Sequence, residues 1–209
     1  MTVTIVDYGV GNIGSIKNIL RKLGENSNVA SDVNILDQAT KLILPGVGAF
    51  DKGMRSIEER GFRDLLDDMV LKRKIPILGI CLGMQLMTYG SEEGSLSGLG
   101  WIPARTIRFR PQHDEVMKIP HMGWNTVKSA KSSSVLQFQE KDPRFYFVHS
   151  FHVCCDDNAD ILLTAEYGLT TFNAAFERDN IVGVQFHPEK SHKFGMALLK
   201  GFLKIQSRI

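Results

Sequence analysis

The sequence contains few cysteines, and their spacing argues against the common disulfide and zinc arrangements. Only three of the 209 residues are cysteine, namely Cys81 and the adjacent pair Cys154 and Cys155. They include no C-x-x-C pair, and an odd number of cysteines in this pattern does not form the framework of a disulfide-rich protein or the usual zinc site. No metal site is therefore expected, and one of the three thiols is a candidate for a reactive group.

The sequence also lacks long apolar runs and an excess of charge of one sign. No run approaches the roughly 18 apolar residues that cross a membrane, and the start MTVTIVDYG has no basic leader before an apolar segment. The 25 basic and 23 acidic residues are well mixed and leave a formal charge of +2, so neither a nucleic-acid nor a membrane partner is indicated. We expect a cytoplasmic protein whose residues 1–209 form one domain, because 43% hydrophobic residues suffice for a full core.

Strand and helix patterns alternate in the first half of the chain, whereas the second half is rich in strands. Apolar strands are expected in TVTIVDY, KLILPG and PILGI, and helices in IGSIKNILRKLG and in MRSIEERGFRDLLDDMVLKR, which is interrupted at Gly61. Later strands are expected in WIPARTIRF, EVMKIP, FYFVHSFHVC, ILLTAEYG, FNAAFER and IVGVQF, before a last helix in FGMALLKGFLKI. These patterns predict an α/β protein with a central mixed sheet, because βα alternation favours parallel strands.

The strongest local signal is the stretch ILGICLGMQLM, residues 77–87. An apolar strand runs into Gly-Ile-Cys-Leu-Gly and then into a helical pattern, which is the arrangement of a nucleophile elbow with Cys81 in place of serine. The glycines leave room for a sharp turn above the sheet, and the helix that follows directs N–H groups toward the sulfur, which favours the thiolate. The alternative is a buried cysteine at a strand end between two packing glycines.

A cysteine nucleophile needs a base, and the base needs a group that orients it. Of six histidines, His187 in IVGVQFHPEKS lies at the end of an apolar strand. Glu189 is two residues further on and faces the same side, so its carboxylate can fix the tautomer of the His187 ring. His149 and His152 are three residues apart on one expected strand, so they are expected to point to opposite faces, as core or rim residues rather than metal ligands.

A third element is LILPGVGAF, residues 42–50, in which an expected strand ends in Pro-Gly-Val-Gly. The flexible turn supplies backbone N–H groups of the kind that bind an oxyanion, alongside the N–H of Leu82 that follows the nucleophile. Taken alone, the stretch is explained equally well as a turn after any strand.

The stretch DYGVGNIGS, residues 7–15, points to a different class of function. Gly9, Gly11 and Gly14 fit G-x-G-x-x-G after an apolar strand, and Asp32 lies 18 residues beyond the last glycine, near the expected position of a ribose-binding acid. Glycine triplets are common, and the strand before Asp32 is weak and polar. A dinucleotide site is therefore the less favoured interpretation beside the cysteine chemistry, which rests on three independent stretches.

These three stretches, PGVG, GICLGMQ and HPE in that order, resemble the class I (triad) glutamine amidotransferases over essentially the whole chain. DYGVGN, SEEG, PHMGWN, FVHSF and FHPEKS resemble more narrowly the glutaminase subunits of imidazole glycerol phosphate synthase. The resemblance implies a flavodoxin-like α/β domain with a mostly parallel central sheet, and hydrolysis of L-glutamine to glutamate and ammonia with no cofactor. It assigns Cys81 as nucleophile, His187 as base and Glu189 as the residue that orients the base.

The resemblance also implies the residues around the substrate. The oxyanion site would be formed by Val47, Gly48 and Leu82, and the glutamine site by Gly46, Gly48, Gln85, Ser150 and Phe151. Relatives often have histidine directly after PGVG, whereas this chain has Ala49.

The resemblance further implies a partner, a (βα)₈-barrel synthase subunit of the HisF type that receives the ammonia in a heterodimer for histidine biosynthesis. The face toward it would include Gly9, Val10, Gly11, Asn12, Trp124 and Asn125. The isolated chain is expected to hydrolyse glutamine slowly and the complex faster. A bulky residue at Gly11 is expected to weaken assembly while leaving the fold and this slow rate nearly unchanged.

Other functions stay open at this point. A paralogue of these subunits could supply ammonia to a sugar amidotransferase in surface-polysaccharide biosynthesis. From other classes, the chain could be a non-catalytic regulatory subunit, a nucleotide-binding module or a general cysteine hydrolase of the same fold.

Overall fold

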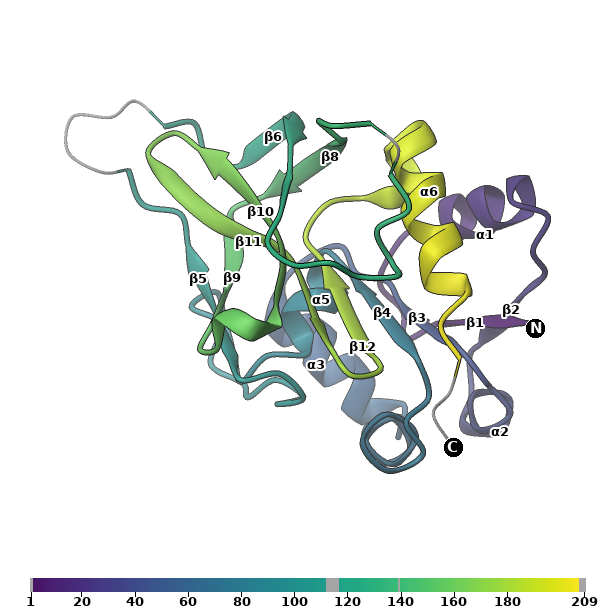
Figure 1. Cartoon of the computed structure of the whole chain (residues 1–209). Coiled ribbons are helices and arrows are strands. Elements are labelled where there is room, and N and C mark those ends of the chain that lie inside the picture. The colour runs from purple at the N-terminus through teal and green to yellow at the C-terminus, as the bar shows by residue number, and fades with distance from the viewer. Residues whose placement is uncertain (1, 112–116, 139, 207–209) are drawn as a thin grey trace.

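The computed structural model describes residues 2–111, 117–138 and 140–206, and its strands form one large mixed sheet and a two-stranded ribbon (Figure 1). Five neighbouring strands of the large sheet are parallel, in the order β2-β1-β3-β4-β12. They are β1 (Val3–Val6), β2 (Ser27–Ala30), β3 (Leu42–Leu44), β4 (Ile77–Ile80) and β12 (Ile181–Val184). This order is that of a flavodoxin-like fold, with β12 in the place of the fifth strand. The fold class expected from the sequence is confirmed.

Antiparallel strands extend the sheet beyond β12. Next to β12 lies β11, which pairs with both β10 and β9, and these in turn pair with β7 and β5. The bounds are β5 (Ala104–Arg108), β7 (Lys128–Ser129), β9 (Phe151–Cys155), β10 (Ile161–Tyr167) and β11 (Thr170–Arg178). The separate ribbon consists of β6 (His121–Thr126) and β8 (Arg144–His149).

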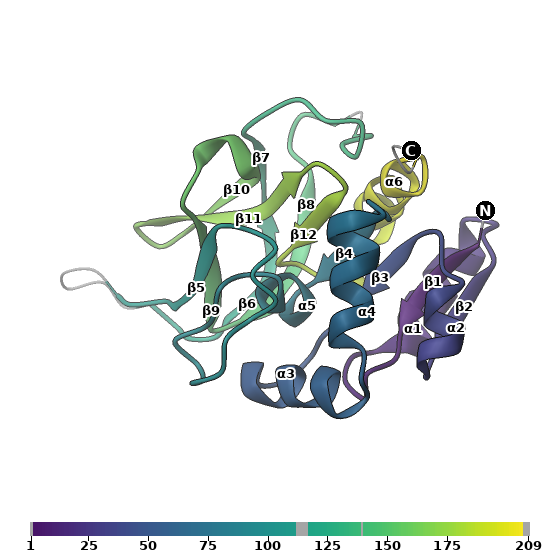
Figure 2. The same cartoon turned by 90° about the horizontal axis from the view of Figure 1, so that it is seen from below.

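Helices cover both faces of the parallel strands, as Figure 2 shows from below. One face carries α1 (Ile13–Lys22) and α6 (His192–Leu203). The other face carries the helices that connect β2 to β3 and β3 to β4, together with the short helix that follows β4. These are α2 (Val33–Asp37), α3 (Phe50–Glu59), α4 (Arg63–Asp67) with the π-helix η1 (Asp68–Lys72), and α5 (Leu82–Leu86). Short 3₁₀ turns are η2 (Asn158–Asp160) and η3 (Pro188–Lys190). No helix in the described part of the chain is long and apolar enough to cross a membrane.

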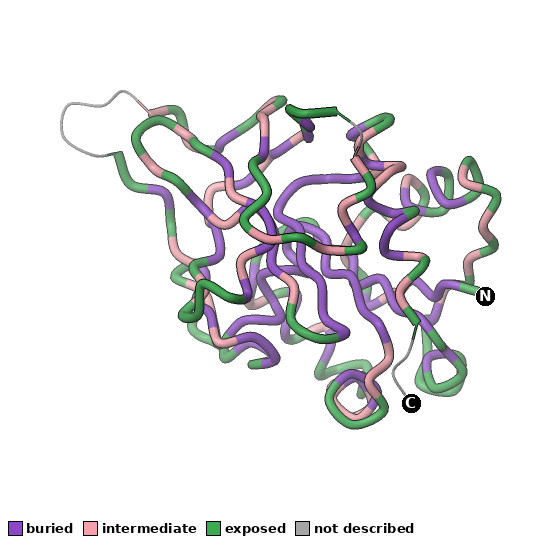
Figure 3. Tube along the Cα trace, in the orientation of Figure 1, coloured by how far each residue is buried: buried purple, intermediate pink, exposed green. Residues whose placement is uncertain are grey.

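The core follows the apolar patterns of the sequence. In α1 the buried side chains are Ile16, Ile19 and Leu20, which share one stripe at helical spacing. All residues of β1, β3, β4 and β12 are buried, and they form the inner part of the tube in Figure 3. Strands with helices on both faces are expected to be apolar throughout rather than alternating.

Three local expectations are corrected by the structure. Residues 117–120 of EVMKIP form no strand, and residues 115 and 116 lie outside the described residues. FYFVHSFHVC is not one strand, because β8 ends at His149 and β9 begins at Phe151. As a result His149 and His152 do not point to opposite faces, and both rings pack on Phe109, with centroids 5.3 and 4.5 Å away.

The carboxyl ends of the parallel strands lie at one edge of the sheet and bring distant stretches together. β1 leads into the loop at residues 7–12, β3 into PGVG, β4 into Cys81, and β12 into Gln185 and His187. In an open α/β sheet this edge is where ligands bind.

Candidate active site at the carboxyl edge of the sheet

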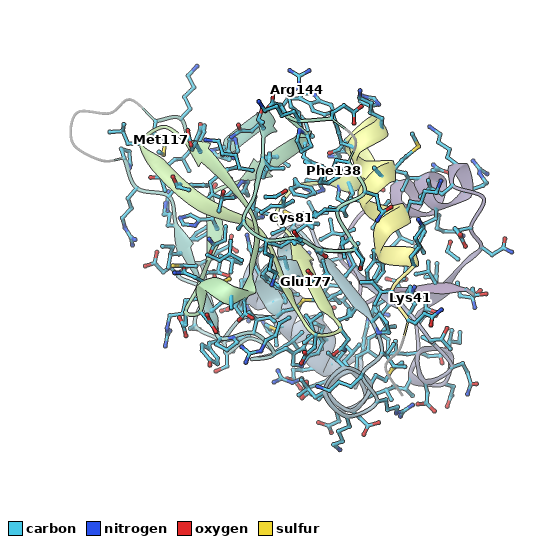
Figure 4. The ribbon with its side chains drawn as sticks, viewed as in Figure 1. Lys41, Cys81, Met117, Phe138, Arg144 and Glu177 are labelled. Carbon is cyan, nitrogen blue, oxygen red and sulfur yellow. The ribbon has the colours of Figure 1, made fainter. Side chains whose placement is uncertain are left out.

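Cys81 lies on a strained turn between β4 and α5. Its φ of 53° and ψ of −108° are unusual for a residue with a side chain, and its N–H donates to the carbonyl of Val184 at 2.8 Å. The turn is possible because Gly83 has no Cβ: a Cβ there would lie 2.0 Å from the carbonyl oxygen of Leu44. Cys81 is 7% exposed and sits near the middle of the molecule (Figure 4). The sharp elbow predicted from Gly-Ile-Cys-Leu-Gly is thus present.

His187 and Glu189 form a buried pair beside Cys81. The Nδ1 atom of His187 lies 2.8 Å from Oε1 of Glu189, and both side chains are 3% exposed. Burial alone would lower the pKa of His187, but hydrogen bonding to Cys81 and Glu189 and their charges outweigh it and raise that pKa to about 10. The other ring nitrogen, Nε2, is buried and, apart from its interaction with Cys81, has no hydrogen-bond partner among the described residues, so it can exchange a proton with a group in the site.

The pair meets through a turn rather than through an extended strand. His187 precedes the 3₁₀ turn η3, which carries Glu189, and the hydroxyl of Ser191 donates to the carbonyl of His187 at 2.6 Å. The turn folds Glu189 back toward Nδ1, which an extended chain would reach less directly. The contact expected between these two residues is present, although the strand geometry expected for it is not.

A cavity of about 430 Å³ opens next to the sulfur, which is within the usual range for a small-molecule site. The residues that line it come from the PGVG turn, the elbow and the break between β8 and β9: Val47, Gly48, Ala49, Cys81, Leu82, Gln85, Glu93, Pro120, Val148, His149, Ser150 and Phe151. Most residues expected to bind an oxyanion or glutamine are therefore assembled around one space. Gly46 is not among the lining residues; it lies against Leu82 and Gly83 at the start of α5.

Glu93 is a residue of this cavity that sequence reasoning did not assign. Its Oε2 accepts a hydrogen bond of 2.8 Å from the N–H of Phe50, the first residue of α3. The N-cap of α3 is Ala49, whose side chain makes no capping bond, so Glu93 satisfies this helix end from another part of the chain. Only the presence of SEEG pointed to Glu93, and no spacing rule links it to Cys81.

Hydrogen bonds from three side chains hold the part of the cavity wall at the break between β8 and β9. Nε2 of Gln85 donates to the carbonyl of Phe151 at 3.2 Å, and Nδ1 of His149 lies 2.7 Å from the same oxygen. Nε2 of His149 lies 3.0 Å from Nδ1 of His121. Burial lowers the pKa of His121 to about 4 and lowers that of His149, so both rings are neutral at pH 7 and this chain of hydrogen bonds can keep one direction.

The loop at residues 7–12 packs on the PGVG turn rather than forming a nucleotide site. The hydroxyl of Tyr8 donates to the carbonyl of Pro45, and a Cβ at Gly11 would lie 2.9 Å from Cβ of Pro45. Gly14, in contrast, has no atom nearer to its Cβ position than 3.9 Å, whereas the fingerprint needs this glycine for close packing of helix on strand. Asp32 caps α2 by accepting from Asn34 and Ile35.

The expectation that a bulky residue at Gly11 would leave the fold unchanged is wrong. Gly11 has a φ of +106°, which is a strained conformation for any residue with a side chain. It also lies against Pro45 next to the cavity. Of the other residues expected at the partner face, Trp124 is 46% exposed and stacks on His192 at 5.5 Å, and Asn12 caps α1. The turn η3 contacts both α1, which follows the loop, and the ribbon strand β8.

Known proteins are similar to this chain over nearly its whole length. A family model described as Glutamine amidotransferase class-I matches residues 4–205. A curated protein of Methanococcus maripaludis named imidazole glycerol phosphate synthase subunit HisH 2 is 51% identical, over 97% of this chain and 98% of its own length. Another of that name, from Pseudomonas aeruginosa, is 46% identical over 97% and 99%. A crystal structure of a glutamine amidotransferase has the same fold, with a TM-score of 0.73, 17% identity and 97% coverage of both chains.

Proposed function

The chain belongs to the glutamine amidotransferase class-I family and, within it, to the HisH subunits of imidazole glycerol phosphate synthase, and from this membership and the site geometry we propose that it hydrolyses L-glutamine to L-glutamate and ammonia. The observation that carries the proposal is the strained elbow of Cys81, which faces the buried His187–Glu189 pair at a cavity that also contains Gln85. A strained nucleophile beside an oriented base is the arrangement of covalent acyl transfer.

Acylation begins with the Cys81 thiolate, which attacks the side-chain carboxamide carbon of glutamine. The negative charge moves to the carboxamide oxygen, where the backbone N–H groups of Leu82 and of the Val47–Gly48 turn would stabilise it. Leu82 is the first residue of α5, and the first N–H groups of a helix have no acceptor within that helix. The protonated Nε2 of His187 then gives its proton to the nitrogen, the carbon–nitrogen bond breaks, and ammonia leaves a γ-glutamyl thioester on Cys81.

Deacylation uses the same groups in the reverse order. His187, now neutral, takes a proton from water, and the hydroxide attacks the thioester carbon. Breaking the carbon–sulfur bond releases glutamate and restores the thiolate beside a protonated His187. Glu189 keeps the proton on Nδ1 throughout, so that Nε2 alone exchanges protons.

The cavity lining would favour free glutamine over a peptide. Glu93 is the only carboxylate among the lining residues and is held by Phe50, so it can pair with the α-ammonium group of free glutamine. A peptide has no such charge at an internal residue. The polar backbone at Ser150 and Phe151 would receive the remaining polar atoms of the substrate.

We further propose that the ammonia passes to a (βα)₈-barrel partner of the HisF type, in a cytoplasmic heterodimer. The partner face would include the loop at residues 7–12 and the ribbon residues Trp124 and Asn125, because η3 contacts both α1, which follows the loop, and the ribbon strand β8. The contact of this loop with Pro45 supports the assignment, because it gives the partner a route to the turn that would bind the oxyanion.

The test replaces Cys81 by Ala in the complete complex. Cys81→Ala should abolish glutamine-dependent synthesis and leave synthesis from ammonium salts unchanged, since only the ammonia source is lost. Cys154→Ala is the matched control, because Cys154 is exposed and far along the chain from the elbow. Glutaminase activity that survives Cys81→Ala would contradict the proposal.

A second candidate function is delivery of ammonia to a sugar amidotransferase in surface-polysaccharide biosynthesis. The names of both relatives carry the number 2, which fits organisms with more than one such subunit. The chemistry at Cys81 would be the same, and only the acceptor would differ. Identification of the barrel subunit that co-purifies with the chain, followed by an assay of its own substrate, separates the two.

A further inference from the structure

The sulfur of Cys81 has a hydrogen-bond donor that the triad does not explain. Nε2 of Gln185 lies 3.6 Å from Sγ of Cys81, and the Gln185 side chain is completely buried. Its Oε1 accepts a hydrogen bond of 3.0 Å from Nε2 of Gln85. A buried amide is desolvated, so it is kept in such a position only when its hydrogen bonds are satisfied.

The pairing of β4 with β12 places Gln185 beside the nucleophile. The two strands are parallel, and the last paired residues are Ile80 and Val184, so the next residues along the two strands are Cys81 and Gln185. Backbone bonds hold both residues: the N–H of Cys81 donates to Val184 at 2.8 Å, and that of Gln185 donates to Ala174 at 2.9 Å. The position of the amide is therefore set by the sheet and not by a flexible loop.

The direction of the side-chain hydrogen bonds follows from a backbone carbonyl. The carbonyl oxygen of Phe151 can only accept, so the amide group of Gln85 must present its nitrogen there. The same nitrogen reaches Gln185, which must therefore present its oxygen. This leaves the NH₂ group of Gln185 toward the sulfur, where it can only donate.

We propose that Gln185 is a catalytic residue that donates a hydrogen bond to the Cys81 thiolate, and that Gln85 is the positioning residue that aims it. A fixed donor stabilises the charged form of its acceptor more than the neutral form, and a thiolate accepts far better than a thiol. The helix α5 has only five residues, which limits what its dipole can add. The same bond stabilises the sulfur again when it leaves the thioester carbon. The inference rests on the proposed function, because it takes Cys81 as the nucleophile.

The experiment measures the rate at which iodoacetamide alkylates Cys81 as a function of pH in the complete isolated chain. Mass spectrometry of the peptide that contains Cys81 separates this thiol from Cys154 and Cys155. The first variant is Gln185→Met, which keeps the length of the side chain and removes the hydrogen-bond donor. The second is Gln185→Glu, which places a carboxylate next to the sulfur of Cys81. Thr88→Val is the matched control, since Thr88 is completely buried and donates to the carbonyl of Gln85 but not to Cys81.

Gln185→Met should move the pH midpoint of alkylation upward by about one unit, which is the size expected for one hydrogen bond to a charged group. Gln185→Glu should move it further, because two negative charges oppose each other. In the complex, the acidic limb of the pH profile of glutaminase kcat/KM should shift with the midpoint. Thr88→Val should lower the thermal stability and leave the midpoint in place.

The inference is overturned if the variants keep the wild-type midpoint, or if Thr88→Val shifts it equally. Should Gln185→Met not fold, Gln185→Glu alone decides, since its carboxylate can still accept from Gln85. A failure of the inference about Gln185 can be distinguished from a failure of the proposed function. A wild-type midpoint in both variants, with Cys81→Ala inactive, removes only the role of Gln185, whereas an active Cys81→Ala removes the nucleophile itself.

Discussion

Gly83→Ala tests whether the elbow and the PGVG turn depend on one missing Cβ. In the structure that Cβ would lie 2.0 Å from the carbonyl oxygen and 2.9 Å from the carbonyl carbon of Leu44, and 3.3 Å from the carbonyl carbon of Pro45. All three atoms are backbone, so no side chain can rotate to relieve the contact. The end of β3 would have to move away from α5, and it would take the turn at Val47 and Gly48 with it.

Two effects of opposite sign determine how much Gly83→Ala changes the free energy of unfolding. Alanine gains about 1 kcal/mol over glycine inside a helix, and Gly83 is the second residue of α5. Overpacking against rigid neighbours costs about 3 kcal/mol, the upper end of its usual range. The clash therefore wins by about 2 kcal/mol. For a chain of 209 residues this lowers Tm by about 4–8 °C.

The assay is thermal unfolding of the isolated chain together with the glutaminase rate of the complex. Gly14→Ala is the matched control, because it also adds a methyl group within a helix, where the nearest atom is 3.9 Å away. Its Tm should stay level or rise. Gly83→Ala should lose both stability and glutaminase activity, since the turn proposed to bind the oxyanion moves away from Cys81. A Gly83→Ala protein as stable and active as the wild type would refute the reasoning about this contact.

Three further predictions concern other parts of the molecule. Glu189→Gln should slow glutaminase turnover and lower the pKa of His187. In the wild type this pKa is raised from 6.5 to about 10, so protonated His187 stabilises the fold fully below pH 6.5 and loses this effect as the pH rises toward 10. In thermal unfolding experiments, the Tm difference between the wild type and Glu189→Gln should therefore shrink from pH 6.5 to pH 10. Lys41→Met should lower Tm by about 2–4 °C, because it removes the hydrogen bond of 3.3 Å from the buried Nζ to the carbonyl of Phe202 near the end of α6. An unchanged Tm would contradict this stabilising role of Lys41. Trp124→Ala should weaken binding of the barrel subunit in titration calorimetry, and the glutaminase rate should stay at the slow value expected of the isolated chain. Leu71→Ala, at a similarly exposed position on η1, should change neither the affinity for the barrel nor the glutaminase rate.

The sequence predicted the parallel half of the sheet and the elbow because both are encoded locally. PILGI is a short apolar strand between breaking residues, and Gly-Ile-Cys-Leu-Gly determines the turn after it. The order PGVG, Cys81, His187 could be combined in one site because all three follow parallel strands, whose carboxyl ends share an edge. Local pattern and global topology agree at these positions.

What the sequence did not predict depends on contacts between distant segments. The break at Ser150 interrupts a run expected to be one strand, and across it Nδ1 of His149 lies 2.7 Å from the carbonyl oxygen of Phe151. Glu93 reaches Phe50 from a loop, and Gln185 meets Cys81 only through the register of β4 and β12. Neither spacing nor periodicity encodes a strand register or a contact from a distant loop, so the contacts of these two residues could be assigned only from the structure.

The most direct measurement of the central claim is the covalent state of Cys81 during turnover. The complex is mixed with glutamine, quenched in acid within the first turnovers, digested and examined by mass spectrometry. The account predicts a glutamyl group on the peptide that contains Cys81, its absence in Cys81→Ala, and its accumulation if deacylation is slowed. Steady glutamine hydrolysis with the glutamyl group on another residue, or sustained in Cys81→Ala, would contradict the account.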